Sequence, residues 1–91
     1  MALDSKINSH FFALVFSLKQ ACLIHLGKIM DPITKKLNRN LEQARVQIDI
    51  LEMLKEKTKG NLTEEERRLL FDTVAELQLN YLEELKKEEK K

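Results

Sequence analysis

Two stretches in the C-terminal two-thirds of the chain repeat apolar residues at the three- and four-residue spacing of an amphipathic helix. The first, over about residues 41–59, carries a main apolar stripe and a second stripe on an adjoining face. The main stripe is Leu41, Ala44, Ile48, Leu51 and Leu54, and the second stripe is Val46, Ile50 and Met53. The other stretch, over about residues 64–86, has a single apolar face, made of Leu70, Val74, Leu77, Tyr81 and Leu85 and widened by Phe71 and Leu82. The pattern predicts two helices, each with a core-facing side.

Residues suited to helix ends border both predicted helices. Asn40 can cap the helix that follows it, with Gln43 in the capping-box place three residues later. Thr63 and Glu66 form a second capping box, and Gly60 can take the left-handed conformation that ends helices. Because the link between the two helices is short, we expect them to pack antiparallel as a helical hairpin.

A third helix is predicted N-terminal to this hairpin, over about residues 5–26. Asp4 or Ser5 can serve as its N-cap, and Gly27 can supply the left-handed residue at its C-terminal end. At ~100° per residue, its apolar side chains span an arc of roughly 220°, broader than the face of an ordinary amphipathic helix. Two neighbouring helices cannot easily cover such an arc. The pattern therefore predicts a further contact, made by a second copy of the chain.

Residues 27–39 are predicted to form a connector, in which Asp31-Pro32 marks a turn. The connector is long enough for the chain to cross over rather than make a tight hairpin between the first two helices. At the other end, residues 86–91 (KKEEKK) suit the last turn of a fraying helix or a disordered tail. We expect one all-α domain over residues 1–91, with three helices, a long first helix and a C-terminal antiparallel hairpin, assembled into an oligomeric bundle.

Composition and charge indicate a folded domain without a strongly charged partner. Hydrophobic residues make up 43% of the 91 residues and charged residues 34%, which is a globular balance. The formal net charge of +1 does not indicate a polyanionic partner. Residues 11–18 have the length of a signal-peptide core, but Asp4 precedes them and Lys19 ends the apolar run. The sequence therefore predicts a cytoplasmic protein with no membrane span.

Three patterns in the chain resemble those of a family of short bacterial proteins catalogued as a domain of unknown function. They are F-x-x-L-V-x-S-L from residue 11, A-x-x-x-I-D-x-L-x-M-L from residue 44, and the turn K-T-x-G-N-L-T-x-E-E from residue 57, which is the most specific. The resemblance covers about residues 11–83. One departure is Leu79-Asn80, where the family pattern has a basic residue shortly before Tyr81. The resemblance implies a bacterial, helical, cytosolic protein, and it implies no reaction.

Residue types that support catalysis or metal binding are few and scattered. His10 and His25 lie fifteen residues apart, without the spacing of a metal site, and we expect His25 to be packed with one nitrogen hydrogen-bonded. Cys22 is the only cysteine, so no internal disulfide forms, and its place in the apolar arc predicts a buried, unreactive thiol. Three acids share a solvated face of the second helix: Asp49, Glu52 and Glu56. We expect no catalysis, no metal and no cofactor.

Lys19 is unusual because it falls in the middle of the first helix's apolar arc. Two interpretations are open. Its stem can lie along apolar surface while the ammonium reaches solvent. Alternatively, it can form a salt bridge with an acid of another helix or another copy, which would fix the register.

We expect a non-catalytic module that self-associates as a homodimer or higher homo-oligomer, since leaving several large apolar side chains in water is unfavourable. The predicted self-association residues are Phe11, Phe12, Val15, Phe16, Lys19, Leu23, Val46, Ile50 and Met53. An unknown partner protein on the same surface is the nearest variant. The alternatives are a peripheral membrane-surface binder that uses the first helix, or a nucleic-acid-associated protein that uses the basic residues in and around the connector: Lys28, Lys35, Lys36 and Arg39.

Overall fold

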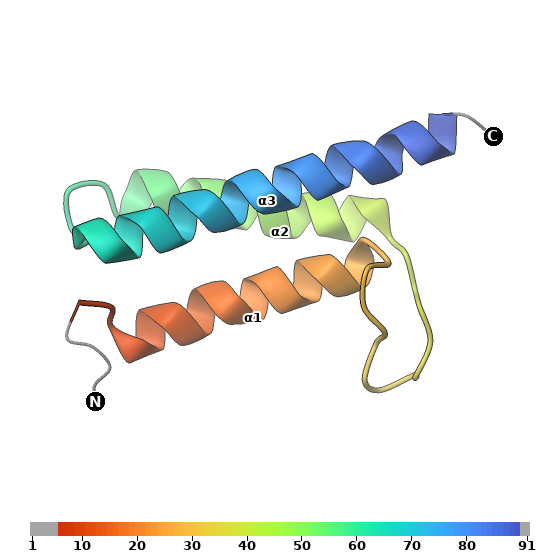
Figure 1. Cartoon of the computed structure of the whole chain (residues 1–91), viewed down its shortest axis with the longest axis horizontal. Helices are drawn as coiled ribbons and strands as arrows, with labels where there is room; N and C mark the ends of the chain where they lie inside the picture. Colours follow the sequence, from red (N-terminus) through yellow and green to blue (C-terminus); the bar gives the residue numbers. More distant parts are fainter. Residues whose placement is uncertain (1–5, 90–91) are drawn as a thin grey trace.

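The computed structural model describes residues 6–89 and consists of three helices, of which the second runs antiparallel to the first and third (Figure 1). These are α1 (Ser9–His25), α2 (Leu41–Lys57) and α3 (Glu64–Glu89), which form a bundle of 46 × 26 × 15 Å. The described residues contain no strand. The predicted all-helical fold with a C-terminal antiparallel hairpin is therefore confirmed.

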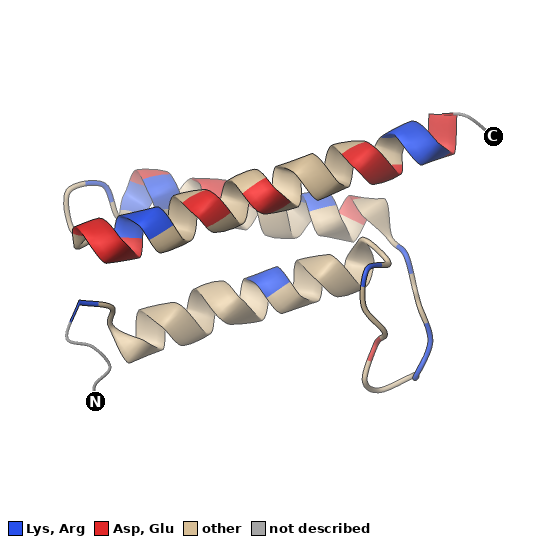
Figure 2. Ribbon diagram, in the orientation of Figure 1, with Lys and Arg blue, Asp and Glu red and all other residues tan. Residues whose placement is uncertain are grey.

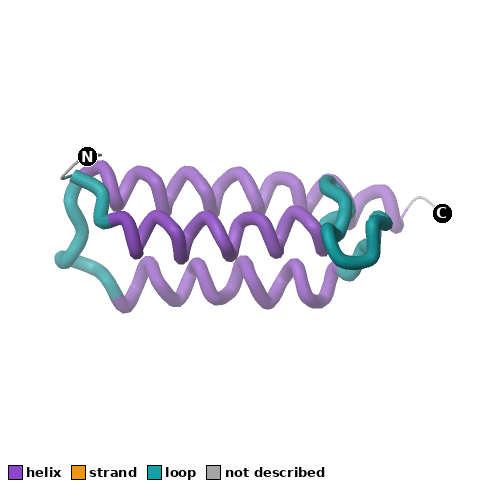
Figure 3. Tube along the Cα trace, turned by 90° about the horizontal axis from the view of Figure 1, so that it is seen from below, coloured by secondary structure: helices purple, strands orange, loops and turns teal. Residues whose placement is uncertain are grey.

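The three helices share one core, because α1 lies over the groove between α2 and α3 (Figure 3). The apolar stripes predicted for α2 and α3 supply most of it, although Phe71 and Leu82 at the edge of the α3 stripe remain 39% and 53% exposed. Burial of each core side chain contributes roughly 1.5–3 kcal/mol to folding. The buried apolar residues are Val15, Cys22, Leu26, Ala44, Ile48, Leu51, Leu70, Val74 and Leu77.

The first helix begins at Ser9, later than the predicted start near residue 5, because Asn8 is its N-cap. The Asn8 side-chain oxygen accepts hydrogen bonds from two backbone N–H groups of the first turn, at 2.9 and 3.1 Å. The Asn8 backbone N–H donates to Glu66 Oε2 at 2.7 Å, which ties the start of α1 to the start of α3. The predicted caps Asp4 and Ser5 lie outside the described residues.

The other predicted N-terminal caps are confirmed. Asn40 Oδ1 accepts a hydrogen bond from the Gln43 N–H at 3.2 Å at the start of α2. At the start of α3, the Thr63 N–H donates to Glu66 Oε1 at 2.9 Å and the Glu66 N–H donates to Thr63 Oγ1 at 3.1 Å, which completes the capping box. The Asn8 and Thr63 backbone donors lower the pKa of the Glu66 carboxyl. Glu66 therefore accepts hydrogen bonds from the backbone at the N-termini of two helices, α1 and α3.

Glycines in the left-handed region end α1 and follow α2, as predicted. Gly27 has φ = 77°, and Gly60 has φ = 83°. After α1 the Lys28 N–H donates to the Leu23 carbonyl at 2.9 Å and the Gly27 N–H to the Ile24 carbonyl at 3.0 Å. These two bonds make a Schellman motif. The helix ends differ slightly from the predicted ones, since α2 ends at residue 57 and α3 continues to residue 89.

The connector between α1 and α2 does not cross over. The Asn40 N–H donates to the His25 carbonyl at 2.7 Å, so the loop is closed at its base and α1 and α2 are antiparallel neighbours. Within the loop, the Asp31 N–H donates to the Lys36 carbonyl at 2.9 Å and the Lys35 N–H to the Asp31 carbonyl at 2.8 Å. These bonds fold the connector back on itself, which is why its length does not carry the chain across the bundle.

Candidate functional site

The part of α1 that its own chain leaves uncovered, called here the outer face, exposes large apolar side chains. Phe12, Leu14 and Phe16 are 46%, 46% and 49% exposed, and the smaller Ala13 between them is also exposed. The Phe12 and Phe16 rings stack on each other, with centroids 6.0 Å apart, so they form one apolar unit at the surface. A helix packed only against its own chain usually turns such residues inward.

Charge distribution separates α1 from the other two helices. Apart from its histidines, α1 has one charged residue among seventeen, Lys19, whereas α2 has seven among seventeen and α3 has thirteen among twenty-six. Figure 2 shows this contrast along the bundle. Exposed helix faces of soluble proteins normally carry charged residues. The outer face of α1 is therefore poorly suited to contact with water alone.

The five apolar residues of α1 that are predicted to self-associate divide into three groups. Phe12 and Phe16 lie on the outer face. Phe11 and Leu23 are half-buried and pack against the core of their own chain. Val15 is 1% exposed, so its assignment to an intermolecular surface is wrong. The reason is geometric: Val15 occupies the middle of the core-facing side, where α2 and α3 cover it.

The three predicted residues of α2 lie on the side of that helix away from the core. Val46 and Met53 are 43% and 44% exposed, and Ile50 is half-buried. They lie about opposite to the buried stripe of α2 on the helical wheel. They form a second, smaller apolar surface.

Lys19 forms a salt bridge with Glu76 of α3, with Nζ and Oε1 3.2 Å apart. The two side chains are 31% and 50% exposed. Of the two interpretations of this lysine, the ion pair with another helix is the one observed, within the same chain. The pair lies at the edge of the α1–α3 contact. Lys19 comes three residues after Phe16 and seven after Phe12, so it lies on the same side of α1 as these exposed rings.

We expect Lys19→Met to change the free energy of unfolding by no more than about 1 kcal/mol, because salt bridges this exposed contribute about 0–1 kcal/mol. Chemical denaturation measures the free energy of unfolding of this variant and of Glu76→Gln, which removes the other partner of the salt bridge. A loss well above 1 kcal/mol in both variants would show that the pair holds α1 in register.

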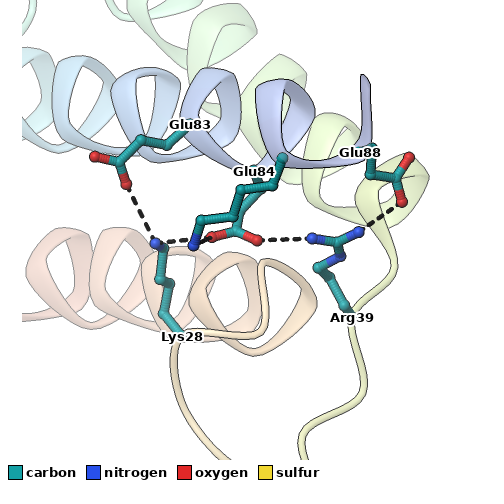
Figure 4. A network of polar contacts seen from close by, with 6 residues as sticks. Lys28, Arg39, Glu83, Glu84 and Glu88 are labelled. Carbon is teal, nitrogen blue, oxygen red and sulfur yellow. Dashed lines mark hydrogen bonds and ion pairs between the residues drawn. The ribbon is translucent and has the colours of Figure 1, made fainter. Parts of the chain in front are cut away.

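A group of charged side chains surrounds Glu84 near the C-terminal end of α3 (Figure 4). The Glu84 side chain is only 7% exposed, and its carboxylate lies 2.9 Å from Lys28 Nζ, 2.8 Å from Arg39 Nη1 and 3.0 Å from Lys87 Nζ. These cations, Lys28 first, lower the pKa of Glu84 to about 2. Lys28 also pairs with Glu83, and Arg39 with Glu88. We call these six residues the Glu84 cluster.

The Glu84 cluster fixes both ends of the connector to α3. Lys28 stands just after α1 and Arg39 just before α2, so one carboxylate binds the two bases of the loop. Two of the four basic residues proposed for phosphate contact are thereby paired with acids. The other two, Lys35 and Lys36, are exposed on the connector.

The candidate chemical residues occupy structural positions. Cys22 is fully buried, its thiol donates to the Ala44 carbonyl at 3.5 Å, and burial raises its pKa to about 11. His25 Nδ1 lies 2.9 Å from Gln47 Oε1, as expected for a packed histidine. Over the described part of the chain, no three His, Cys, Asp or Glu side chains come together to hold a metal ion.

Two of the three acids predicted to share a solvated face of α2 line a groove between α2 and α3, and Glu56 is exposed outside it. The groove has a volume of about 390 Å³ and includes Asp49 and Glu52. Arg45 pairs with Asp49 at 3.3 Å and lies over the Tyr81 ring, 6.0 Å from its centroid. Glu52 pairs with Lys55, with the two charged atoms 3.5 Å apart, so both carboxylates of the groove have a basic partner on α2.

No helix within residues 6–89 is long and apolar enough to cross a membrane. Comparisons with curated proteins and with solved structures find no match. The sequence model of a domain of unknown function, DUF1844, matches residues 8–83, close to the span of the resemblance seen in the sequence. The chain therefore belongs to the DUF1844 family.

Proposed function

We propose that this protein is a non-catalytic self-association module in which the outer face of α1 packs against a second copy of the chain. The observation that carries this proposal is the combination of three half-exposed large apolar residues on α1 with a lack of charge on the exposed part of the same helix. Burying the exposed part of each phenylalanine contributes about 1 kcal/mol. In a two-fold dimer each contact occurs twice.

Two alternatives have less support. A nucleic-acid contact through the connector would have to rely on Lys35 and Lys36, because Lys28 and Arg39 are held by the Glu84 cluster. Attachment of α1 to an anionic membrane surface would require basic residues beside the apolar ones, and the single lysine of α1 is paired with Glu76. A cytoplasmic location in a bacterium fits the lone buried cysteine and the resemblance, and belongs to the same proposal.

We expect Phe12→Glu to raise the concentration at which the oligomer half-dissociates by about 30-fold or more, because a charge buried at the centre of an interface costs 2 kcal/mol or more. Static light scattering across a dilution series of the purified chain measures this concentration. Circular dichroism of the same samples checks that the variant keeps its helices.

Leu79→Glu is the matched control, since Leu79 is 67% exposed on the side of α3 away from the core. It makes the same apolar-to-acid change without touching α1, and it should leave the dilution curve unchanged. A wild-type chain that stays a single copy at high concentration would refute the proposal.

A further inference from the structure

The connector carries a second set of exposed apolar residues. Met30, Ile33 and Leu37 are 55%, 89% and 61% exposed. Polar contacts tie the loop that presents them: Asp31 Oδ1 accepts from the Ile33 N–H at 2.8 Å, and Glu84 forms ion pairs with both loop ends. Such an arrangement holds apolar side chains in water without cover from their own chain.

The connector and the outer face of α1 lie on the same side of the bundle. In Figure 1 the loop extends past the C-terminal end of α1, away from α2 and α3. Figure 3, turned by 90°, places α1 and the connector together on the side nearest the viewer. The connector therefore projects at the C-terminal end of α1, on the side of the bundle that α1 occupies.

The outer face of α1 is too small to make a stable dimer by itself. Of the seventeen residues of α1, two are buried, so at most fifteen are available to a partner. A stable interface uses about 20–30 residues on each side. The thirteen residues of the connector, 27–39, would bring the surface into that range.

We propose that two copies pack through α1 in an antiparallel two-fold arrangement, with the connector of each copy covering the N-terminal half of the other copy's α1. This rests on the proposed self-association and specifies its geometry. An antiparallel pair places the N-terminal end of one α1, which bears Phe12 and Phe16, beside the C-terminal end of the other, where the connector projects. The exposed apolar residues of the loop and of the helix then cover each other, and two-fold symmetry repeats the contact.

Variants with one added cysteine test this geometry directly. Ser9 and Ile33 are both exposed, so their replacement does not disturb the core. When Ser9→Cys and Ile33→Cys chains of different tag length are mixed and mildly oxidised, we expect a disulfide between them. In the matched control, the Ser9→Cys chain is mixed with a Leu79→Cys chain instead. The yield of the disulfide-linked pair should be at least tenfold lower. The native Cys22 is buried in the unsubstituted chain, and the added cysteines replace exposed residues.

Self-crosslinking establishes the direction of the helices. Ser17 stands at the middle of α1, so Ser17→Cys is expected to crosslink to its own copy in an antiparallel pair. Two Ser9 positions would be about 24 Å apart in that pair, sixteen residues at ~1.5 Å each. A disulfide requires the two Cα atoms to be within about 7 Å. Efficient self-crosslinking of Ser9→Cys would mean a parallel pair and would overturn this geometry.

The connector's contribution is measured by Ile33→Asp. We expect it to raise the half-dissociation concentration at least tenfold while the chain stays folded, because the Ile33 side chain has almost no contact within its own chain. The connector contact would be refuted if Ile33→Asp formed the oligomer normally and the Ser9→Cys and Ile33→Cys chains gave no crosslink. Self-association would then still stand. A monomeric wild type would refute both. If Ile33→Asp instead abolished binding to phosphatidylserine vesicles with an unchanged dilution curve, the connector would serve a lipid surface and the proposal would fail.

Discussion

Replacing Glu84 with glutamine is expected to lower the free energy of unfolding by about 1.5–3 kcal/mol at pH 7, the range for hydrogen bonds to charged groups. Glu84 is the only member of its cluster that binds Lys28, Arg39 and Lys87 together among the described residues. A neutral amide would keep part of the hydrogen bonding but would leave three cations around it without their shared counter-charge. Urea denaturation followed by circular dichroism measures the loss.

The free energies of unfolding of wild type and Glu84→Gln are also expected to differ in their pH dependence. The folded-state pKa of Glu84, about 2, lies below its ordinary value of 4.5. Its contribution to stability is therefore fully present above pH ~4.5 and disappears as pH falls toward 2. The difference between wild type and Glu84→Gln should shrink across that window.

Glu83→Gln is the control for Glu84→Gln, because the Glu83 side chain is 62% exposed and contacts only Lys28 within the Glu84 cluster. It should cost less than about 1 kcal/mol. Equal losses in the two variants, or a difference that persists unchanged at pH 2, would show that the buried carboxylate is not what holds the connector on α3.

Leu51→Ala is expected to lower the free energy of unfolding by about 2–5 kcal/mol, which is the cost of removing a buried leucine and leaving a cavity. Leu51 is 0% exposed, in the middle of α2, and belongs to the core shared by all three helices. A domain of this size is stable by only about 5–10 kcal/mol. The variant should therefore be largely unfolded at moderate urea concentrations. The loss of helical signal in circular dichroism measures this.

Met53→Ala, two residues further along α2, serves as the comparison for Leu51→Ala. Its side chain is 44% exposed on the opposite side of the helix, so its loss should cost less than about 1.5 kcal/mol. Both variants must be measured at one protein concentration, because association raises apparent stability. If Met53→Ala proved as costly as Leu51→Ala, the assignment of core and surface sides of α2 would be wrong.

The hairpin could be predicted from the sequence because its signals are local. Thr63 and Glu66 cap α3 from three residues apart, and the main stripe of α2 reads directly as a core face. The single apolar face of α3 leaves no choice of orientation, and the main stripe of α2 is longer than its second stripe. The first helix is different, since an apolar arc of roughly 220° is compatible with several orientations. Only the packed structure shows that Val15 faces the core while Phe12 and Phe16 remain outside.

The remaining differences come from contacts between residues distant in sequence. The start of α1 is the exception, because Asn8 caps it through local bonds from the His10 and Phe11 N–H groups, and an asparagine before an apolar run is a capping signal. Glu84 gathers Lys28 and Arg39 from the connector, 45 or more positions away. In the sequence, Glu84 is one of several charged residues near the end of a predicted helix, and nothing nearby distinguishes it from the others. The basic character of the connector was visible, but its pairing with α3 has no local signal.

The buried thiol of Cys22 makes the bundle a reporter of its own opening. With its Sγ bonded to the Ala44 carbonyl and its pKa near 11, the thiol reacts with a reagent only when α1 separates from α2. The rate of modification in native buffer therefore measures the population of chains whose first helix has come away. No label or substitution is needed for this, since the chain contains no other cysteine.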